Sequence, residues 1–230
     1  MKKIFSTLTL LALCFSSLQL FAQGDSPTLK HRPGGMWHFY ADESRNENGP
    51  NILLIGDSVL SGYAENIVAE LGEANVDYWL TPMHLTSKEI LEDLQSVVSF
   101  RDYDVIQFNI GLHGWQADRM TEEAYPQAIK EYVKALKKSA KKSKLIWATV
   151  TPVTEDGVMA LNAEINPVII NKNESAAKIM SKYKVTTNDL YGLVVDRLDL
   201  AKLDRFHWSE EGSKMMSDQS IRYIKEALKK

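Results

Sequence analysis

Residues Asn51 to Ser58 have the sequence Asn-Ile-Leu-Leu-Ile-Gly-Asp-Ser, and this stretch decides the fold. Its apolar, β-branched part predicts a buried strand that ends in Gly56-Asp57-Ser58, and a helix-like pattern follows at once. Such a strand places a small hydroxyl at the carboxyl edge of a sheet, beside the N-terminus of a helix. Open α/β folds carry their chemistry at that edge. The stretch therefore predicts a functional site around Ser58.

Outward from this stretch, the chain alternates between strand-like and helix-like patterns. Apolar strands separated by helices predict a parallel sheet that is covered by helices on both faces. Residues 24–50 are rich in Pro, Gly and charge, which favours an ordered lead-in or a loose arm over a domain. The predicted strands are 51–56, 75–80, 103–110, 144–150 and 183–187, and the predicted helices are 61–72, 87–99, 121–142, 161–182 and 210–229.

The size and charge of the chain limit the classes of protein that fit. Its 230 residues, 44% of them hydrophobic, are enough for one domain with a full core. A net charge of −3 disfavours nucleic acid and anionic membranes as partners. The sequence has no His, Asp and Glu set with the spacing of a metal site, and no Gly-rich phosphate loop.

The first 22 residues have the pattern of a secretory signal peptide, with a buried N-terminal helix as the alternative. Lys2 and Lys3 form a positive n-region, residues 4–21 are apolar with scattered serines, and Ala22 offers a small residue for cleavage. The serines make this stretch a poor transmembrane span. We therefore predict a signal peptide at 1–22, an N-terminal arm at 23–50 and one domain at 51–230. The protein is then exported to the periplasm or the extracellular space.

Cys14 is the only cysteine of the chain. The segment Leu11-Ala-Leu-Cys14 resembles a lipoprotein box, but Leu13 is too large for the position before the cysteine, so lipid anchoring is not expected. Cleavage of the signal peptide would leave no cysteine. Disulfides, thiol catalysis and cysteine-zinc sites are then excluded together.

Near the other end of the chain, Asp204-Arg-Phe-His207 supplies the base and the carboxylate that a nucleophilic serine needs. A serine hydroxyl is a poor nucleophile until a neighbouring base takes its proton, and an imidazole held by a carboxylate is the usual solution. Each segment alone is also compatible with an ordinary turn. Together they predict that Asp204 hydrogen-bonds one ring nitrogen of His207, while the other nitrogen faces Ser58.

Five short blocks follow one another along the chain: Ile55-Gly-Asp-Ser-Val59, Gly111-Leu-His-Gly114, Thr149-Val-Thr-Pro152, Asn188-Asp-Leu-Tyr191 and Asp204-Arg-Phe-His207. Their order resembles that of the SGNH (GDSL) hydrolase superfamily, over about residues 50–215. The resemblance implies a three-layer α/β/α sandwich, flavodoxin-like, with a central parallel sheet of about five strands. It also implies an ester-hydrolysing triad of Ser58, Asp204 and His207 that needs no metal and no cofactor.

Two blocks depart from the family pattern. The family's third block is usually Gly-x-Asn-Asp, whose Asn donates to the oxyanion, but here His113 occupies that position and Gly114 follows. An imidazole N–H can also donate, so we predict an oxyanion role for His113, with a structural histidine as the alternative. The second block usually supplies a glycine N–H, and residues 81–87 contain no glycine. The other predicted donors are the Ser58 backbone N–H, a backbone N–H from residues 83–87, or the side chain of His84.

Four further residues lie close to these motifs in the sequence. Trp115 and Trp208 could stack on sugar rings at the rim of a cleft, or could simply anchor their loops. Asp57 is expected to support the turn through a hydrogen bond. Strand alternation leaves open whether Asn109 points toward the site.

These observations predict an exported serine esterase that removes small acyl groups, such as acetyl, from carbohydrates through an acyl-enzyme. One alternative is a non-catalytic carbohydrate-binding protein on the same fold, which the two irregular oxyanion positions motivate. Another is a lipid or thioester acylhydrolase, which the absence of a large apolar lid in the sequence disfavours. The expected partner is a small acyl ester or an acetylated glycan, and the oligomeric state stays open.

Overall fold

The computed structural model describes residues 26–32, 34–42 and 46–229. The predicted signal peptide, including Cys14, lies outside the described residues. Within the described part, none of the helices combines the length and the apolar character needed to span a bilayer.

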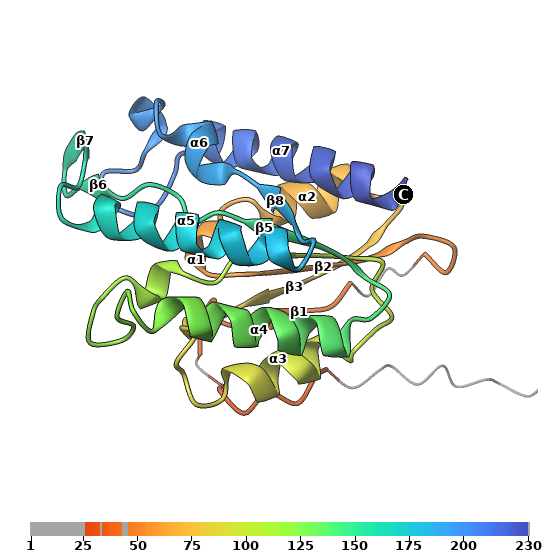
Figure 1. Cartoon of the computed structure of the whole chain (residues 1–230). Coiled ribbons are helices and arrows are strands. Elements are labelled where there is room, and N and C mark those ends of the chain that lie inside the picture. The colour runs from red at the N-terminus through yellow and green to blue at the C-terminus, as the bar shows by residue number, and fades with distance from the viewer. Residues whose placement is uncertain (1–25, 33, 43–45, 230) are drawn as a thin grey trace, which may run out of the picture.

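The centre of the molecule is a six-stranded sheet with the strand order β1-β3-β2-β4-β5-β8 (Figure 1). Four of its five parallel strands lie within or at the positions that the sequence predicts, and the fifth, predicted at 183–187, lies at residues 186–188. The sixth strand, β1, comes from the N-terminal arm and pairs antiparallel with β3 at the edge of the sheet, which the sequence did not predict. The strands are β1 (Phe39–Tyr40), β2 (Asn51–Gly56), β3 (Asn75–Leu80), β4 (Val105–Phe108), β5 (Lys144–Ala148) and β8 (Thr186–Asn188).

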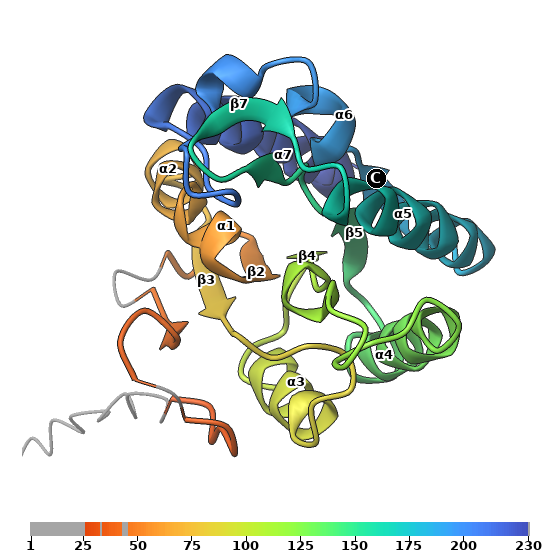
Figure 2. The same ribbon diagram turned by 90° about the vertical axis from the view of Figure 1, so that its left-hand side faces the viewer.

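Helices cover both faces of this sheet (Figure 2). Successive side chains of a strand point to opposite faces, so Ile52 and Leu54 of β2 pack in one apolar cluster while Leu53 and Ile55 pack in the other. Both faces are buried, which explains the uninterrupted apolar sequence of the strand. The predicted three-layer α/β/α fold is confirmed. One layer contains α2 (Ala64–Glu70), α6 (Leu190–Val194) and α7 (Glu210–Leu228), and the other contains α3 (Ile90–Val98), α4 (Tyr125–Ser139) and α5 (Ile165–Lys182).

The predicted helices 61–72 and 161–182 are wrong at their starts. The first is two helices, α1 (Ser58–Ser61) and α2, because Asp57 caps a helix that begins directly after the strand. The second begins at Ile165, where the side-chain oxygen of Asn162 accepts the backbone N–H groups of Glu164 and Ile165. Residues before it form a hairpin, β6 (Thr154–Glu155) with β7 (Val158–Leu161), whose strands are too short to give an alternating pattern. Two 3₁₀ turns complete the fold, η1 (Leu112–Gly114) and η2 (Leu198–Leu200).

Candidate active site

Ser58 lies at the carboxyl end of the central strand, on the first residue of α1. Gly56 makes the sharp change of direction possible, because a Cβ atom there would lie 2.7 Å from the Cβ of Leu60. Asp57 caps the short helix, and its Oδ1 accepts the Val59 N–H at 2.9 Å. The N–H of Ser58 is at a helix start, where no acceptor exists within the helix. The hydroxyl and the N–H of Ser58 therefore occupy the same edge of the sheet.

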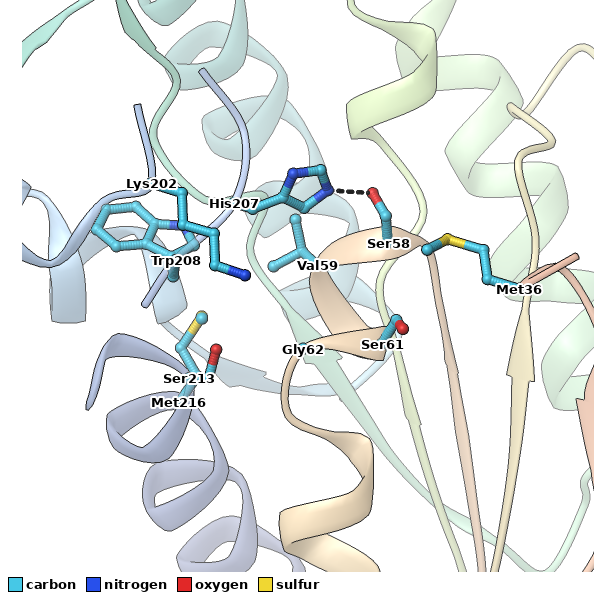
Figure 3. Close-up of a pocket in the computed structure, with 10 residues that line it drawn as sticks. All are labelled: Met36, Ser58, Val59, Ser61, Gly62, Lys202, His207, Trp208, Ser213 and Met216. Carbon is cyan, nitrogen blue, oxygen red and sulfur yellow. Dashed lines mark hydrogen bonds between the residues drawn. The ribbon is translucent and has the colours of Figure 1, made fainter. Parts of the chain in front are cut away.

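A continuous hydrogen-bonded chain joins Ser58, His207 and Asp204. Figure 3 shows its bond between Ser58 and His207. The Nε2 of His207 is 2.9 Å from the Oγ of Ser58, and its Nδ1 is 2.8 Å from the Oδ2 of Asp204. Burial raises the pKa of Asp204, but the backbone N–H and the ring of His207, with the backbone N–H of Phe206, outweigh it and hold the pKa below its usual value. An ionised Asp204 can only accept, so Nδ1 donates to it and Nε2 accepts from the serine hydroxyl. This is the tautomer of a general base.

The β6–β7 hairpin holds the loop that carries Asp204 and His207. The N–H of Thr154 donates to the carbonyl of Arg205 at 2.9 Å, and the N–H of Gly157 donates to the carbonyl of Leu203 at 3.0 Å. Arg205 itself has a φ of 79°, a left-handed conformation that is uncommon for a residue with a side chain. The tight turn between Asp204 and His207 is thus supported from outside the loop.

His113 lies on η1, which follows β4, and β4 is the neighbour of β2 in the sheet. Its Nε2 is buried and has no hydrogen-bond partner among the described residues. Burial lowers the pKa of His113; Asp57 opposes this effect, while Arg119 and His207 add to it. The imidazole is therefore neutral near pH 7 and keeps one N–H. The geometry is compatible with a donor to an oxyanion, and that role stays a prediction.

Lys172 is a residue of this region that the sequence interpretation missed. It is buried on α5, where its Nζ donates to the carbonyl of Gly114 at 2.5 Å and to that of Met120 at 3.0 Å. Burial lowers the pKa of its ammonium, and Glu122 partly opposes the shift. The signal was present in the sequence, because Lys172 interrupts the buried stripe of Ile165, Ile169, Ala176 and Met180 at helical spacing.

The loop after β3 uses most of the backbone donors that were predicted to complete the oxyanion hole. The N–H of Met83 donates to the Oγ1 of Thr81 at 3.2 Å, and the N–H of His84 donates to the Oγ of Ser87 at 3.0 Å. The N–H of Ser87 in turn donates to the carbonyl of His84. These three N–H groups are therefore occupied within the loop.

The side chain of His84 is hydrogen-bonded to the nearby Thr86. The Oγ1 of Thr86 donates its single proton to the carbonyl of Arg119 at 2.6 Å, and it lies 2.7 Å from the Nδ1 of His84. That nitrogen must then be the donor in the pair, which leaves Nε2 with a lone pair in the neutral ring. An oxyanion role for His84 through Nε2 is incompatible with this tautomer.

A cavity of about 230 Å³ opens beside Ser58 (Figure 3). Trp208 forms part of its wall, but only 4% of this residue is exposed and it packs in the core beneath α7. Trp115 packs instead against the small apolar cluster around Leu112 and Val150. The lining residues are Met36, Ser58, Val59, Ser61, Gly62, Lys202, His207, Trp208, Ser213 and Met216.

Asn109 is not among the residues that line this cavity. Its side-chain amide donates to the carbonyls of Ala148 and Thr149, both at 3.0 Å, and so ties the end of β4 to the end of β5. In the described part of the chain, His, Cys, Asp and Glu residues form no group of three that could hold a metal ion.

No protein-family model and no curated protein matches this sequence. Solved structures resemble the fold. A member of the lipolytic G-D-S-L family from Veillonella parvula aligns with a TM-score of 0.62 at 17% identity, over 77% of this chain and 99% of that one. The lipase/acylhydrolase from Enterococcus faecalis gives 0.61 at 16% identity, over 76% and 95%. A candidate acylhydrolase from Bacteroides fragilis gives 0.63 at 15% identity, over 93% and 98%. The chain therefore has the fold of the SGNH (GDSL) hydrolases.

Proposed function

We propose that this protein is a serine ester hydrolase of the SGNH type that works through an acyl-enzyme. The observation that carries the proposal is the hydrogen-bonded chain Ser58–His207–Asp204 at the carboxyl edge of the sheet. On this fold, that edge is where a nucleophile meets its substrate. The geometry also has the correct tautomer for a general base.

In the first half-reaction the Oγ of Ser58 attacks the ester carbonyl carbon while its proton passes to the Nε2 of His207. The tetrahedral oxyanion then collapses, the carbon–oxygen bond to the alcohol breaks, and His207 returns the proton to the leaving alkoxide. In the second half-reaction His207 deprotonates a water molecule that attacks the acyl-enzyme, and Ser58 leaves with the proton. Asp204 stays ionised throughout and stabilises the imidazolium.

Two groups support the developing negative charge in this proposal. The N–H of Ser58 is at the start of α1, and the ring of His113 carries a buried nitrogen that has no hydrogen-bond partner in the part of the chain that the structure describes. Removal of one such donor typically lowers the rate by ~10²–10³.

We further propose that the substrate is a small acyl ester, such as an acetyl group on a carbohydrate, and that the protein acts after export. The small cavity and its hydroxyls, Ser61 and Ser213, support a polar alcohol component. The signal-peptide pattern of residues 1–22 supports export. Acetate release from acetylated glycans, with N-terminal sequencing of the secreted protein, tests both parts.

One observation favours a second candidate, an acylhydrolase for longer chains. The β6–β7 hairpin exposes Val158, Met159 and Leu161, and Leu203 is exposed beside it in the loop that carries Asp204. This exposed apolar surface next to the loop of Asp204 was not expected from the sequence. A series of p-nitrophenyl esters of increasing chain length separates the two candidates, because a small-acyl esterase prefers acetate and an acylhydrolase prefers longer acyl groups.

Labelling with a fluorophosphonate distinguishes the proposed esterase from the alternative function, a non-catalytic carbohydrate-binding protein. We expect covalent labelling at Ser58, and we expect Ser58→Ala to lose both labelling and hydrolysis, by several orders of magnitude in kcat, with an unchanged melting temperature. An unlabelled wild-type protein that still binds acetylated glycans would refute the enzyme and support the binding module.

A further inference from the structure

The N-terminal arm is fastened to the domain by a buried carboxylate on α3. Asp93 is fully buried, and its two oxygens accept the backbone N–H groups of Lys30 at 2.5 Å and His31 at 2.9 Å. A buried carboxylate is costly unless hydrogen bonds compensate it. Asp93 therefore depends on the docked arm for its partners.

Two buried polar side chains of β3 fasten the other end of the arm. The Oδ1 of Asp77 accepts the N–H of Asp42 at 2.9 Å. The Oδ1 of Asn75 accepts the N–H of Asn46 at 2.7 Å, and its Nδ2 donates to the Asn46 carbonyl at 2.9 Å. The arm thus supplies partners to both side chains, while the Oδ2 of Asp77 accepts the hydroxyl of Tyr103 at 2.7 Å and pairs with Arg101 at 2.8 Å within the domain.

Between these anchors the arm passes the active site. Met36 lines the cavity, and its side chain extends toward Ser58 from the side opposite His207 (Figure 3). The next residue, Trp37, lies with its ring edge-to-face against the ring of His113, with centroids 5.4 Å apart and an interplanar angle of 80°. The carbonyl of His38 then accepts the N–H of Leu80 and starts the pairing with β3.

We propose that the N-terminal arm completes the active site: Met36 is a specificity-determining residue that limits the acyl group, and Trp37 is a positioning residue that acts through His113. The inference rests on the proposed esterase function and adds two residues to it. The Nε2 of His113 has no hydrogen bond within the described chain, and the ring of Trp37 packs edge-to-face against the imidazole, so this contact helps to fix the orientation of the ring. Misplacement of a catalytic group by about 1 Å can cost ~10²-fold in rate.

The contribution of Trp37 is measured with a double-mutant cycle on kcat. We expect Trp37→Ala to lower kcat by roughly tenfold or more with a smaller change in KM, and Trp37→Phe to recover part of the loss. In the His113→Ala background, Trp37→Ala should have no further effect on kcat, because its target is absent. Tyr40→Ala is the matched control: it removes another aromatic contact of the arm, the stack on Tyr78 at 4.7 Å, and its effect should be the same in both backgrounds.

The contribution of Met36 is measured as chain-length preference on p-nitrophenyl esters. Met36→Ala enlarges the cavity, so the ratio of kcat/KM for hexanoate to that for acetate should rise by about tenfold or more. Leu29→Ala is the control, since it removes an apolar contact of the arm elsewhere and should leave that ratio unchanged.

Equal effects of Trp37→Ala in the presence and absence of His113, or an unchanged chain-length ratio in Met36→Ala, would overturn the inference while leaving the esterase proposal intact. Hydrolysis that survives Ser58→Ala would instead overturn the proposed function, and the inference with it.

Discussion

At the scale of single residues, Ser58 and His207 come from opposite ends of the domain and are in contact only in the folded protein. They are separated by 149 positions in the chain, and only the sheet edge brings the Nε2 of His207 to the serine hydroxyl. Asp204 needs no such help, because a turn of three residues is enough for it to reach the Nδ1 of His207. Lys172 has no hydrogen bond to Ser58, Asp204 or His207. It donates to the carbonyl of Gly114, the residue next to His113.

Lys172→Met tests that role. The substitution keeps the volume of the side chain but leaves the carbonyls of Gly114 and Met120 without their donor. We expect kcat to fall by roughly tenfold, with a smaller change in KM, because the loop of His113 loses its fixed position. Lys178→Met, an exposed lysine on the same helix, is the control and should leave kcat unchanged. Equal kinetics of the two variants would make Lys172 a packing residue only.

At the scale of elements, the β6–β7 hairpin is a support for the loop of the proposed base. Gly157 forms its turn with a φ of +72°, which L-residues with a side chain rarely adopt, and its N–H donates to the carbonyl of Leu203. A Cβ atom at Gly157 would meet no atom within 4 Å. Any cost of a side chain there is therefore backbone strain and not a clash.

Gly157→Ala is expected to destabilise the fold by about 1 kcal/mol, which lowers the melting temperature by ~2–4 °C, and to reduce kcat as the Asp204 loop loosens. Gly34→Ala is the control, because Gly34 also has open space around its Cβ position and no left-handed φ, so both quantities should stay at wild-type values. If fully folded Gly157→Ala protein had the wild-type kcat, the hairpin would have no role in catalysis.

At the scale of the whole molecule, buried tyrosines set the alkaline limit of stability. Burial raises the pKa of Tyr63, Tyr103, Tyr125 and Tyr132, and nearby Asp residues add to the shift at Tyr63 and Tyr103. The unfolded chain ionises tyrosine near pH 10, whereas the folded chain keeps these protons. The stability from these tyrosines is thus complete below pH 10 and is lost as the pH rises above it. Burial lowers the pKa of Lys172, so its contribution to stability rises with pH. This single lysine opposes the effect of the four tyrosines and does not reverse it.

We therefore expect the free energy of unfolding, measured by urea titration, to fall steeply above pH 10, by up to about 1.4 kcal/mol per pH unit for each of these tyrosines. Tyrosinate absorbance at 295 nm should show the same groups ionising only as the protein unfolds. Ionisation of all tyrosines near pH 10 in the folded protein would contradict the burial of Tyr63, Tyr103, Tyr125 and Tyr132.

The sequence by itself determined the alternating α/β pattern, the three-layer fold and the three residues of the hydrogen-bonded chain, because strand apolarity and short polar motifs are local properties. Tertiary structure alone decided what the N-terminal arm does. Its Pro, Gly and charged residues carry no periodicity, and its anchors, Asn75, Asp77 and Asp93, belong to other elements. The same holds for Trp37, which meets His113 only because the arm is docked at the edge of the sheet. Contacts between segments without a pattern of their own depend on the folded surface that receives them.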